Sequence, residues 1–267
     1  MFTDSHCHLA SHKFSENEVK EILARAKTAG INRFITLGTD LEDLATNLAL
    51  TKQHESIFCS LGIHPCDVTE TPDNYLETLE PNFSDPKVVA VGESGLDYFH
   101  PAPEGWSTED YHARQRKFLD QHFQLAERTK RNIVLHTRDR SGAASFDDCL
   151  EIYKRYSSQV RAVFHCFPGT LPQAEQVLDL GGLVSFTGNV TFKNAHQIQE
   201  TASKLPLGSF MLETDSPYLA PTPYRGKRNE PAYIKEIAYH ICTLKKIAPE
   251  ELSKATEEAV NRFFFHS

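Results

Sequence analysis

The chain begins with two histidines whose spacing suits metal binding. Residues 2–9 read Phe-Thr-Asp-Ser-His-Cys-His-Leu, so one residue separates His6 from His8. Successive side chains of a strand point to opposite faces, which would place both imidazoles on one face and Cys7 on the other. Imidazole nitrogen is a common ligand of divalent metals. The pair therefore predicts half of a metal site where the first strand ends, with the remaining ligands supplied by later segments.

Similar residues follow other apolar segments of the chain. A single His-x-His pair is a weak signal, because most histidines are surface residues or hydrogen-bonded core residues. Here, however, histidines and carboxylates recur at the ends of short apolar runs: His64, Glu93, His136, His165, Glu213 and Asp215. If these runs are parallel strands, all of the side chains lie at one pole of the same sheet. This shared position favours a joint metal site over unrelated histidines.

Short apolar, β-branched runs alternate with longer helical patterns along the chain. We expect strands at residues 2–8, 32–38, 56–62, 87–92, 132–136, 161–165, 182–186 and 209–213. We expect helices at residues 16–29, for about a dozen residues from Leu41, and at 73–82, 107–130, 143–156, 171–180 and 194–203, with two more after Asn229 and Pro249. The segment 99–106 is rich in proline and should form an exposed loop.

This alternation predicts an α/β fold. Short apolar strands without clean polar alternation are typical of parallel sheets that are buried on both faces. Eight strand and helix units in about 250 residues indicate a (β/α)8 TIM barrel of the metallo-dependent hydrolase type, as a single domain over residues 1–267. A doubly wound open sheet is the alternative. The first strand lacks the G-x-G-x-x-G turn that a dinucleotide-binding member of that class carries, which favours the barrel.

Composition restricts the class of protein. Of the 267 residues, 40% are hydrophobic and 24% are charged, as in ordinary globular proteins. No apolar run is long enough to span a membrane, and the lead before His6 is too short for a signal peptide. We therefore expect a cytoplasmic protein with no membrane partner. We also expect a monomer. The 6 cysteines form no C-x-x-C pair, which indicates reduced thiols. A net charge of -8 excludes a global basic field, so any phosphate binding needs local positive charge.

The ligand types predict two metal ions. Four imidazoles and two carboxylates exceed the needs of one tetrahedral zinc with an open position, but they suffice for two ions that share a bridging carboxylate. Glu93 is the natural bridge, since it lies midway in the strand order and follows Gly92, which permits close approach. One ion would take His6, His8, Glu93 and Asp215, and the other Glu93, His136 and His165. Such ligands suit zinc, manganese or magnesium, and the sequence does not select among them.

Seven short motifs extend over nearly the whole chain. They are D-S-H-C-H-L (4–9), G-I-H-P (62–65), V-G-E-S-G-L-D-Y (91–98), L-H-T-R (135–138), F-H-C-F-P-G (164–169), E-T-D-S-P-Y-L-A-P (213–221) and R-G-K-R-N-E-P (225–231). In this order the sequence resembles the TatD family of metal-dependent deoxyribonucleases, within the amidohydrolase superfamily. The resemblance implies a barrel with two, sometimes three, divalent ions. It also implies 3'-to-5' exonuclease activity on DNA and a broader phosphodiesterase capacity. Two metal ions in such a site would activate a bound water, and the resulting hydroxide would attack the phosphodiester.

The family's ligands fall on the set already chosen from the strand ends: His6, His8, Glu93, His136, His165 and Asp215. Two departures from the family pattern touch no ligand. Ser94 replaces a more usual aliphatic residue, and Arg138-Asp139-Arg140 replaces a more usual Arg-Glu-Ala run. The second departure lies near the expected rim and could alter substrate preference.

Four acidic or imidazole side chains receive further roles. Asp215 and Glu93 are the catalytic candidates, with Asp215 expected to take the proton of the attacking water; the alternative is that Asp215 is only a ligand. Glu213 shares its strand face with Asp215 and would bind a third ion or hold a metal ligand in place; the alternative is that a neighbouring lysine pairs with its charge. His64 is expected to reach substrate phosphate or the metal ligands, the alternative being an ordinary loop histidine.

The substrate expected from the resemblance is DNA, at single strands or 3' ends. Arg225, Lys227 and Arg228 follow the last strand, where barrels often bind phosphate, and would contact the nucleotide backbone. A solvated basic turn is the alternative.

Two other functions remain open from the sequence. One is a metal-dependent ester or amide hydrolase of the same superfamily, such as an aminoacyl-tRNA deacylase. Glu93 stands where many amidohydrolases use a carboxylated lysine, which favours the nuclease branch. The other is a degenerate barrel that only binds, against which the intact ligand set argues.

Overall fold

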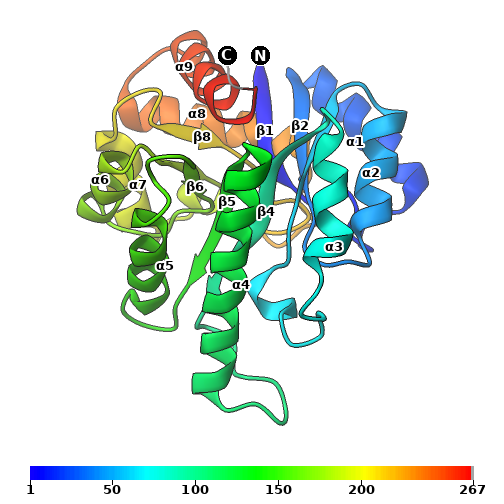
Figure 1. Cartoon of the computed structure of the whole chain (residues 1–267). Coiled ribbons are helices and arrows are strands. Elements are labelled where there is room, and N and C mark those ends of the chain that lie inside the picture. The colour runs from blue at the N-terminus through cyan, green and yellow to red at the C-terminus, as the bar shows by residue number, and fades with distance from the viewer. Residues whose placement is uncertain (266–267) are drawn as a thin grey trace.

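Eight parallel strands form one sheet in the computed structural model, which describes residues 1–265 (Figure 1). Each strand pairs with the next one along the chain, as predicted for a TIM barrel. The strands are β1 Phe2–Cys7, β2 Ile31–Leu37, β3 Ile57–Leu61, β4 Val88–Asp97, β5 Asn132–Arg138, β6 Ala162–Phe164, β7 Leu183–Phe186 and β8 Phe210–Leu212.

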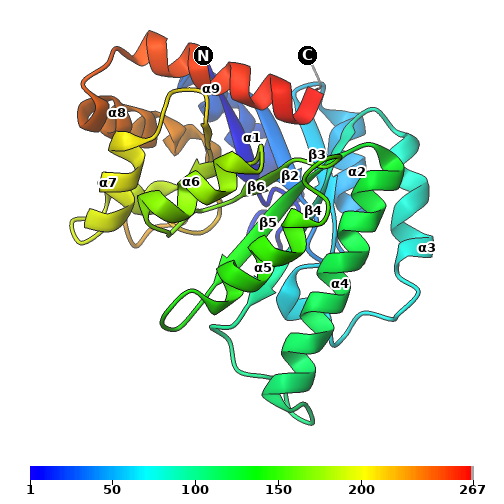
Figure 2. The ribbon, with the colours of Figure 1, turned by 60° about the vertical axis from the view of Figure 1, so that its left-hand side comes forward.

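The helices surround this sheet, and the long helix α4 extends well beyond the strands (Figure 2). They are α1 Glu16–Thr28, α2 Leu44–Gln53, α3 Leu76–Leu79, α4 Thr108–Thr129, α5 Ala144–Lys154, α6 Leu171–Asp179, α7 His196–Lys204, α8 Ile234–Lys245 and α9 Pro249–Val260. A π-helical turn, Asn261–Phe265, continues α9. Within residues 1–265, none of the helices combines the length and apolarity that crossing a membrane requires.

Backbone hydrogen bonds join the ends of the first and last strands. The N–H of Asp215 donates to the carbonyl of His6 at 2.9 Å, and the N–H of His8 donates to the carbonyl of Ser216 at 2.8 Å. These bonds close the barrel at its carboxyl end. As a result, residues that are more than 200 positions apart in sequence are held in fixed register at the place where the sequence predicts metal ligands.

The opposite end of the barrel is covered by apolar side chains. Helix α9 lies across the end at which both termini are found (Figure 1). Val260 and Phe263 are buried in one cluster with strand residues such as Ile35, Val89 and Val134. This packing fills the amino end of the barrel, so the polar pocket described below opens at the carboxyl ends of the strands.

Strand β4 differs from the prediction, because it continues through Asp97 instead of ending near Gly92. The pairing with β5 shifts between Val91 and Ser94, and Gly92 has a φ of 132°. A Cβ on Gly92 would lie 2.6 Å from the carbonyl oxygen of Val134, so only glycine fits this approach. Glu93 therefore projects from within a strand, where both neighbouring strands fix its position.

Two helices also begin differently from the prediction. Helix α2 begins at Leu44, not Leu41, because the carboxylate of Asp40 accepts the N–H groups of Glu42 and Asp43 at 2.7 and 2.8 Å and forms a turn first. The helix expected at 73–82 is only four residues long, and a 3₁₀ turn, Glu80–Ser84, follows it. The proline-rich segment 99–106 contains neither helix nor strand, as expected.

A buried histidine fixes the segment that follows β3. His122 of α4 is fully buried, donates from Nδ1 to the carbonyl of Phe118 at 2.7 Å, and accepts the N–H of Ile63 at Nε2 over 3.1 Å. Nε2 can accept only while the imidazole is neutral. Burial lowers the pKa of His122 to about 4, so the ring stays uncharged in the folded protein at neutral pH. This contact holds the chain next to His64.

Acid is expected to destabilise the fold through His122. The unfolded chain binds a proton at this residue below about pH 6.5, whereas the folded protein binds it only near pH 4. The free energy of unfolding should therefore fall by about 2 kcal/mol from pH 7 to pH 5 through this group alone. Urea unfolding of the metal-free protein at both pH values measures the change.

The matched variants isolate this contribution. His122→Gln keeps a donor for Phe118 and an acceptor for Ile63, but it does not titrate, so its stability should depend less on pH. The exposed His196→Gln should behave like the unaltered protein. The same pH dependence in His122→Gln and the unaltered protein would show that His122 is not the cause.

Candidate metal centre

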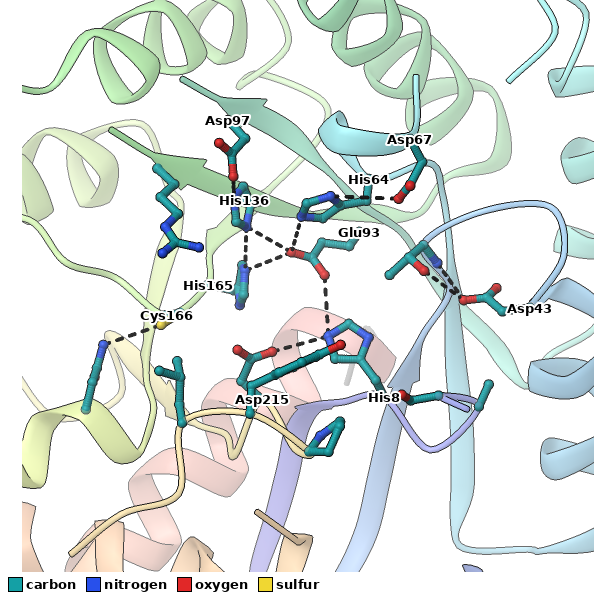
Figure 3. Close-up of a pocket in the computed structure, with 18 of the residues that line it drawn as sticks. His8, Asp43, His64, Asp67, Glu93, Asp97, His136, His165, Cys166 and Asp215 are labelled. Atoms are coloured by element: carbon teal, nitrogen blue, oxygen red, sulfur yellow. Dashed lines mark hydrogen bonds and ion pairs between the residues drawn. The ribbon is translucent and has the colours of Figure 1, made fainter. Parts of the chain in front are cut away.

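A pocket of about 1310 Å³ opens at the carboxyl ends of the strands. Figure 3 shows His8, Glu93, His136, His165 and Asp215 pointing into it, from within β4 and β5 and from the chain that follows β1, β6 and β8. His6 lies beneath them and is fully buried, with its ring stacked on that of His165 at a centroid distance of 4.0 Å. The structure thus brings together all six residues that the sequence predicts as metal ligands.

The two carboxylate oxygens of Glu93 face two separate sets of nitrogen atoms. Oε2 lies 3.3 Å from Nε2 of His6 and 3.6 Å from Nε2 of His8. Oε1 lies 3.1 Å from Nδ1 of His136 and 2.9 Å from Nε2 of His165. Burial alone would raise the pKa of Glu93, but the surrounding imidazoles hold it well below its ordinary value. The side chain is therefore an ionised carboxylate with one oxygen for each half of the site.

Asp215 belongs to the half that contains His6 and His8. Its Oδ1 lies 3.2 Å from Nε2 of His8 and 3.6 Å from Nε2 of His6. Asp215 follows the end of β8, and its backbone adopts the left-handed conformation, with a φ of 56°. This turn brings its side chain over the pocket. Burial opposes ionisation of Asp215, but the hydrogen bond from His8 and the charge of His6 lower its pKa below the ordinary value. Asp215 is thus available as an anionic ligand or a base.

Two buried carboxylates orient the histidines of the other half. Oδ2 of Asp97 lies 3.1 Å from Nε2 of His136, so that Nδ1 of this ring faces Glu93. Oε1 of Glu213 lies 3.3 Å from Nδ1 of His165, so that Nε2 of this ring faces Glu93. Carboxylates in this position fix the tautomer and orientation of a metal-binding histidine and raise its basicity.

Asp97 is a residue that the sequence prediction missed as a member of the site. It lies in the motif V-G-E-S-G-L-D-Y, four residues after Glu93. Because side chains repeat every second residue in a strand, positions 93 and 97 share one face as soon as β4 is extended past Gly92. The position of Asp97, an even number of residues after Glu93, was therefore the signal in the sequence that could have placed it in the site.

Glu213 is placed behind His165. Besides that ring, it accepts the N–H of Cys166 at 2.7 Å and the hydroxyl of Ser185 at 2.6 Å. These contacts favour the role of holding a ligand over that of binding a third ion, and no lysine pairs with it among the described residues. The expected strand alternation with Asp215 was wrong, because β8 ends at Leu212, before both residues.

His64 lies against the half of the site that contains His136, with a ring centroid distance of 4.6 Å between them. Its Nδ1 accepts the N–H of Cys66 at 3.2 Å, which leaves the proton of the neutral ring on Nε2. Burial lowers the pKa of His64 to about 3, so the ring is neutral at physiological pH. Nε2 lies 3.7 Å from Oε1 of Glu93 and points into the pocket as a hydrogen-bond donor.

The three basic residues after β8 separate into two groups. Arg225 and Lys227 line the pocket, and the Arg225 guanidinium lies 4.3 Å from the ring centroid of Phe192. The structure does not bring Arg228 to the pocket. Its guanidinium donates to the Lys13 carbonyl and to the Glu18 carboxylate, both at 2.7 Å, because α1 lies beside this loop. The prediction of a substrate contact is therefore corrected for Arg228.

Several observations fit divalent cations at this centre. Nε2 of His6 and Nε2 of His8 face each other at 3.2 Å, and Nδ1 of His136 faces Nε2 of His165 at 3.3 Å. Pairs of ring nitrogens at such distances suit a cation that both can coordinate. Nδ1 of His6 is buried without a hydrogen-bond partner, which leaves Nε2 as the working atom of this ring. Three sets of three side chains at this centre could each hold a cation, because the ligand atoms within each set lie within 4.8 Å of one another. The sets are His6 with His8 and Glu93, His6 with His165 and Asp215, and His64 with Glu93 and His136.

Comparison with known proteins identifies the family. The family model described as TatD related DNase matches residues 3–265. The chain belongs to the TatD family. The Escherichia coli (strain K12) protein YcfH, named an uncharacterized metal-dependent hydrolase, is 33% identical over 263 residues, which cover 98% of this chain and 94% of that protein. The Bacillus subtilis (strain 168) protein YabD, named in the same way, is 31% identical over 265 residues, or 99% of each chain.

Solved structures agree with this assignment. The crystal structure of YjjV, a TatD homologue from Escherichia coli K12, superposes with a TM-score of 0.88 at 31% identity and covers 99% of this chain and 98% of that chain. The phosphotriesterase homology protein of Escherichia coli, crystallised with phosphate in its active site, has a TM-score of 0.68 at 15% identity and shows the shared fold alone. The protein is thus a TatD-family metal-dependent hydrolase with a TIM-barrel fold.

Proposed function

We propose that this TatD-family hydrolase cleaves phosphodiester bonds of DNA with two divalent cations and removes nucleotides from 3' ends. The observation that carries the proposal is the division of Glu93, whose two oxygens face different sets of histidines. His6, His8, Glu93 and Asp215 would hold one cation, and Glu93, His136 and His165 the other. Magnesium, manganese and zinc all accept such ligands. Two cations that share one carboxylate are a common arrangement for hydrolysis at phosphorus.

The side chains of this centre have distinct tasks in the proposed reaction. Bound cations would lower the pKa of a water molecule and neutralise charge on the phosphate. Asp215, which is ionised, would accept the proton of the attacking water. His64 would donate from Nε2 to a phosphate oxygen, since its Nδ1 is occupied by the N–H of Cys66.

The charge distribution of the pocket supports a polyanionic substrate on one side. Arg138, Arg225 and Lys227 line the pocket and could contact successive phosphates. The side of the lining formed by the chain after β2 and β3 carries carboxylates: Asp40, Glu42, Asp43 and Asp67. A nucleic-acid strand would be repelled from that side, which suits entry of one strand end better than passage of a long duplex. DNA single strands and 3' ends are therefore the proposed substrates, and a monomer would suffice because one chain supplies the whole site.

The acidic side of the pocket also favours a second candidate function. In an aminoacyl-tRNA, the ammonium group of the amino acid lies next to the ester bond. Carboxylates such as Asp43 and Asp67 could bind this ammonium group. The same centre would then attack a carbonyl carbon instead of phosphorus. A metal-dependent ester or amide hydrolase, such as an aminoacyl-tRNA deacylase, is the alternative that the experiment must separate.

End-labelled DNA separates these functions. Metal-stripped protein reloaded with magnesium, manganese or zinc is incubated with single-stranded DNA that carries a label at the 3' or the 5' end. We expect early release of the 3' label, and a ladder of shortening products from the 5'-labelled strand, only with metal present. Aminoacyl-tRNA and a small ester are assayed in parallel. Turnover of an ester with no DNA cleavage under any metal would move the function to the alternative.

A further inference from the structure

Beside the metal centre lies a second group of side chains of metal-ligating types, which shares Asp97 with the main centre. Cys66 follows β3, Asp97 ends β4, and His100 lies in the loop after β4. One donor atom from each lies within 4.8 Å of the other two. Sγ of Cys66 is 3.6 Å from Nδ1 of His100, which is 3.0 Å from Oδ2 of Asp97. Donors around a tetrahedral zinc ion are spaced by about 3 to 4 Å, so these distances need little adjustment.

Cys66 and Asp97 compete for Nδ1 of His100. If this nitrogen carries a proton for Asp97, the thiol hydrogen of Cys66 finds no lone pair on it, and the hydrogen-bond partners left to the thiol are Asp97 and Tyr111. If the thiol donates to Nδ1 instead, two lone pairs of His100 and Asp97 face each other at 3.0 Å. A cation in place of both protons would contact all three side chains at once.

The surrounding structure holds two of the three ligands in place and leaves access to solvent. Oδ1 of Asp97 accepts the N–H groups of Phe99 and His100 at 3.0 and 2.9 Å, which fixes the carboxylate. The N–H of Cys66 is bound to His64. The side chain of His100 is 45% exposed, so a cation can enter from the pocket rim without opening the core.

We propose that Cys66, Asp97 and His100 form a separate site for a thiophilic divalent cation such as zinc. Thiolate, imidazole and carboxylate together select zinc, cobalt or cadmium over magnesium or calcium, which avoid sulfur. The site differs in chemistry from the main centre, where nitrogen and oxygen are the donors. Binding displaces the thiol proton of Cys66, so affinity rises with pH.

The proposed site is connected to the main centre through one atom. Oδ2 of Asp97 contacts both His100 and Nε2 of His136. A cation on Asp97 withdraws negative charge from the hydrogen bond that orients His136. Loss of such an orienting carboxylate typically weakens metal binding or activity about 10- to 100-fold. Zinc in excess over the main centre is therefore expected to inhibit the enzyme, in contrast to magnesium or manganese.

Cobalt provides a direct spectroscopic test that needs no substrate. Cobalt is added to the metal-free protein, and the thiolate-to-cobalt charge-transfer band in the near ultraviolet is recorded. We expect this band in the unaltered protein and its loss in Cys66→Ser. Cys166→Ser is the matched control, because Cys166 is half-buried like Cys66 but lines the pocket beside the main centre, and this variant should keep the band. A band that persists in Cys66→Ser, or that depends on Cys166, overturns the proposal.

The zinc content gives a second readout. After equilibrium dialysis against zinc, Cys66→Ser and His100→Ala should each contain one zinc ion fewer per chain than the unaltered protein. His100 is exposed, so its replacement leaves the fold intact, and circular dichroism checks this for both variants. Equal zinc content in all three proteins overturns the proposal. Because the comparison is a difference of one ion, it remains informative even if the main centre does not cleave DNA.

Discussion

Glu93→Gln is expected to reduce the rate of hydrolysis by about 10³-fold or more and to release both proposed cations of the main centre. Each oxygen of Glu93 faces a different pair of histidines at 2.9 to 3.6 Å, so the charge of one carboxylate serves both halves of the site. Glutamine has nearly the same shape, but its amide nitrogen cannot coordinate a cation, and the negative charge is lost. Activity and the metal content per chain are measured on the same preparations.

The control for this variant is Glu104→Gln, a similar change in the exposed loop after β4. It should keep full activity and metal content. Circular dichroism establishes that Glu93→Gln is folded. A folded Glu93→Gln protein that retained two cations would exclude the bridging role, and with it the observation that carries the proposed function.

Asp215→Asn is expected to reduce kcat about 10²- to 10⁴-fold with a smaller effect on KM. The side chain is ionised, lies 3.2 Å from His8, and is supplied by the turn after β8. Asparagine can still coordinate through its carbonyl oxygen, but it cannot accept a proton. The variant therefore tests the role of base more strongly than the role of ligand.

Metal content separates the two roles of Asp215. If kcat falls while two cations remain bound, the carboxylate acts as the base. If one cation is lost together with activity, ligation accounts for the effect. Asp179→Asn, an exposed change on α6, is the matched control and should leave both quantities unaltered. Unchanged kcat in Asp215→Asn would remove this residue from the reaction.

The spacing of histidines and carboxylates in the sequence predicted the main features of the site. Apolar runs that end in His or Glu identified the parallel strands, because the carboxyl ends of such strands meet at one pole. The period of two residues identified His6 and His8 as neighbours on one face. These are local properties of the chain, so the residue types alone were sufficient, and the structure brings the six predicted ligands together.

Tertiary structure decided which residues support those ligands. Asp97 reaches His136 only because β4 continues past the register shift at Gly92, and the pairing of β4 with β5 determines that shift. Arg228 was expected in the pocket, but α1 offers it the Glu18 carboxylate. Neither outcome can be read from neighbouring residues.

The same distinction explains why the sequence did not predict the second cation site that we propose. Cys66 and His100 are 34 positions apart, and neither belongs to a spacing that predicts metal binding. They meet because the chain segments after β3 and β4 leave adjacent strands of the barrel side by side. The sequence determined which side chains leave each strand at the reactive end. Long-range pairing of strands determined which of those side chains come within reach of one another, because that pairing depends on the packing of the whole barrel.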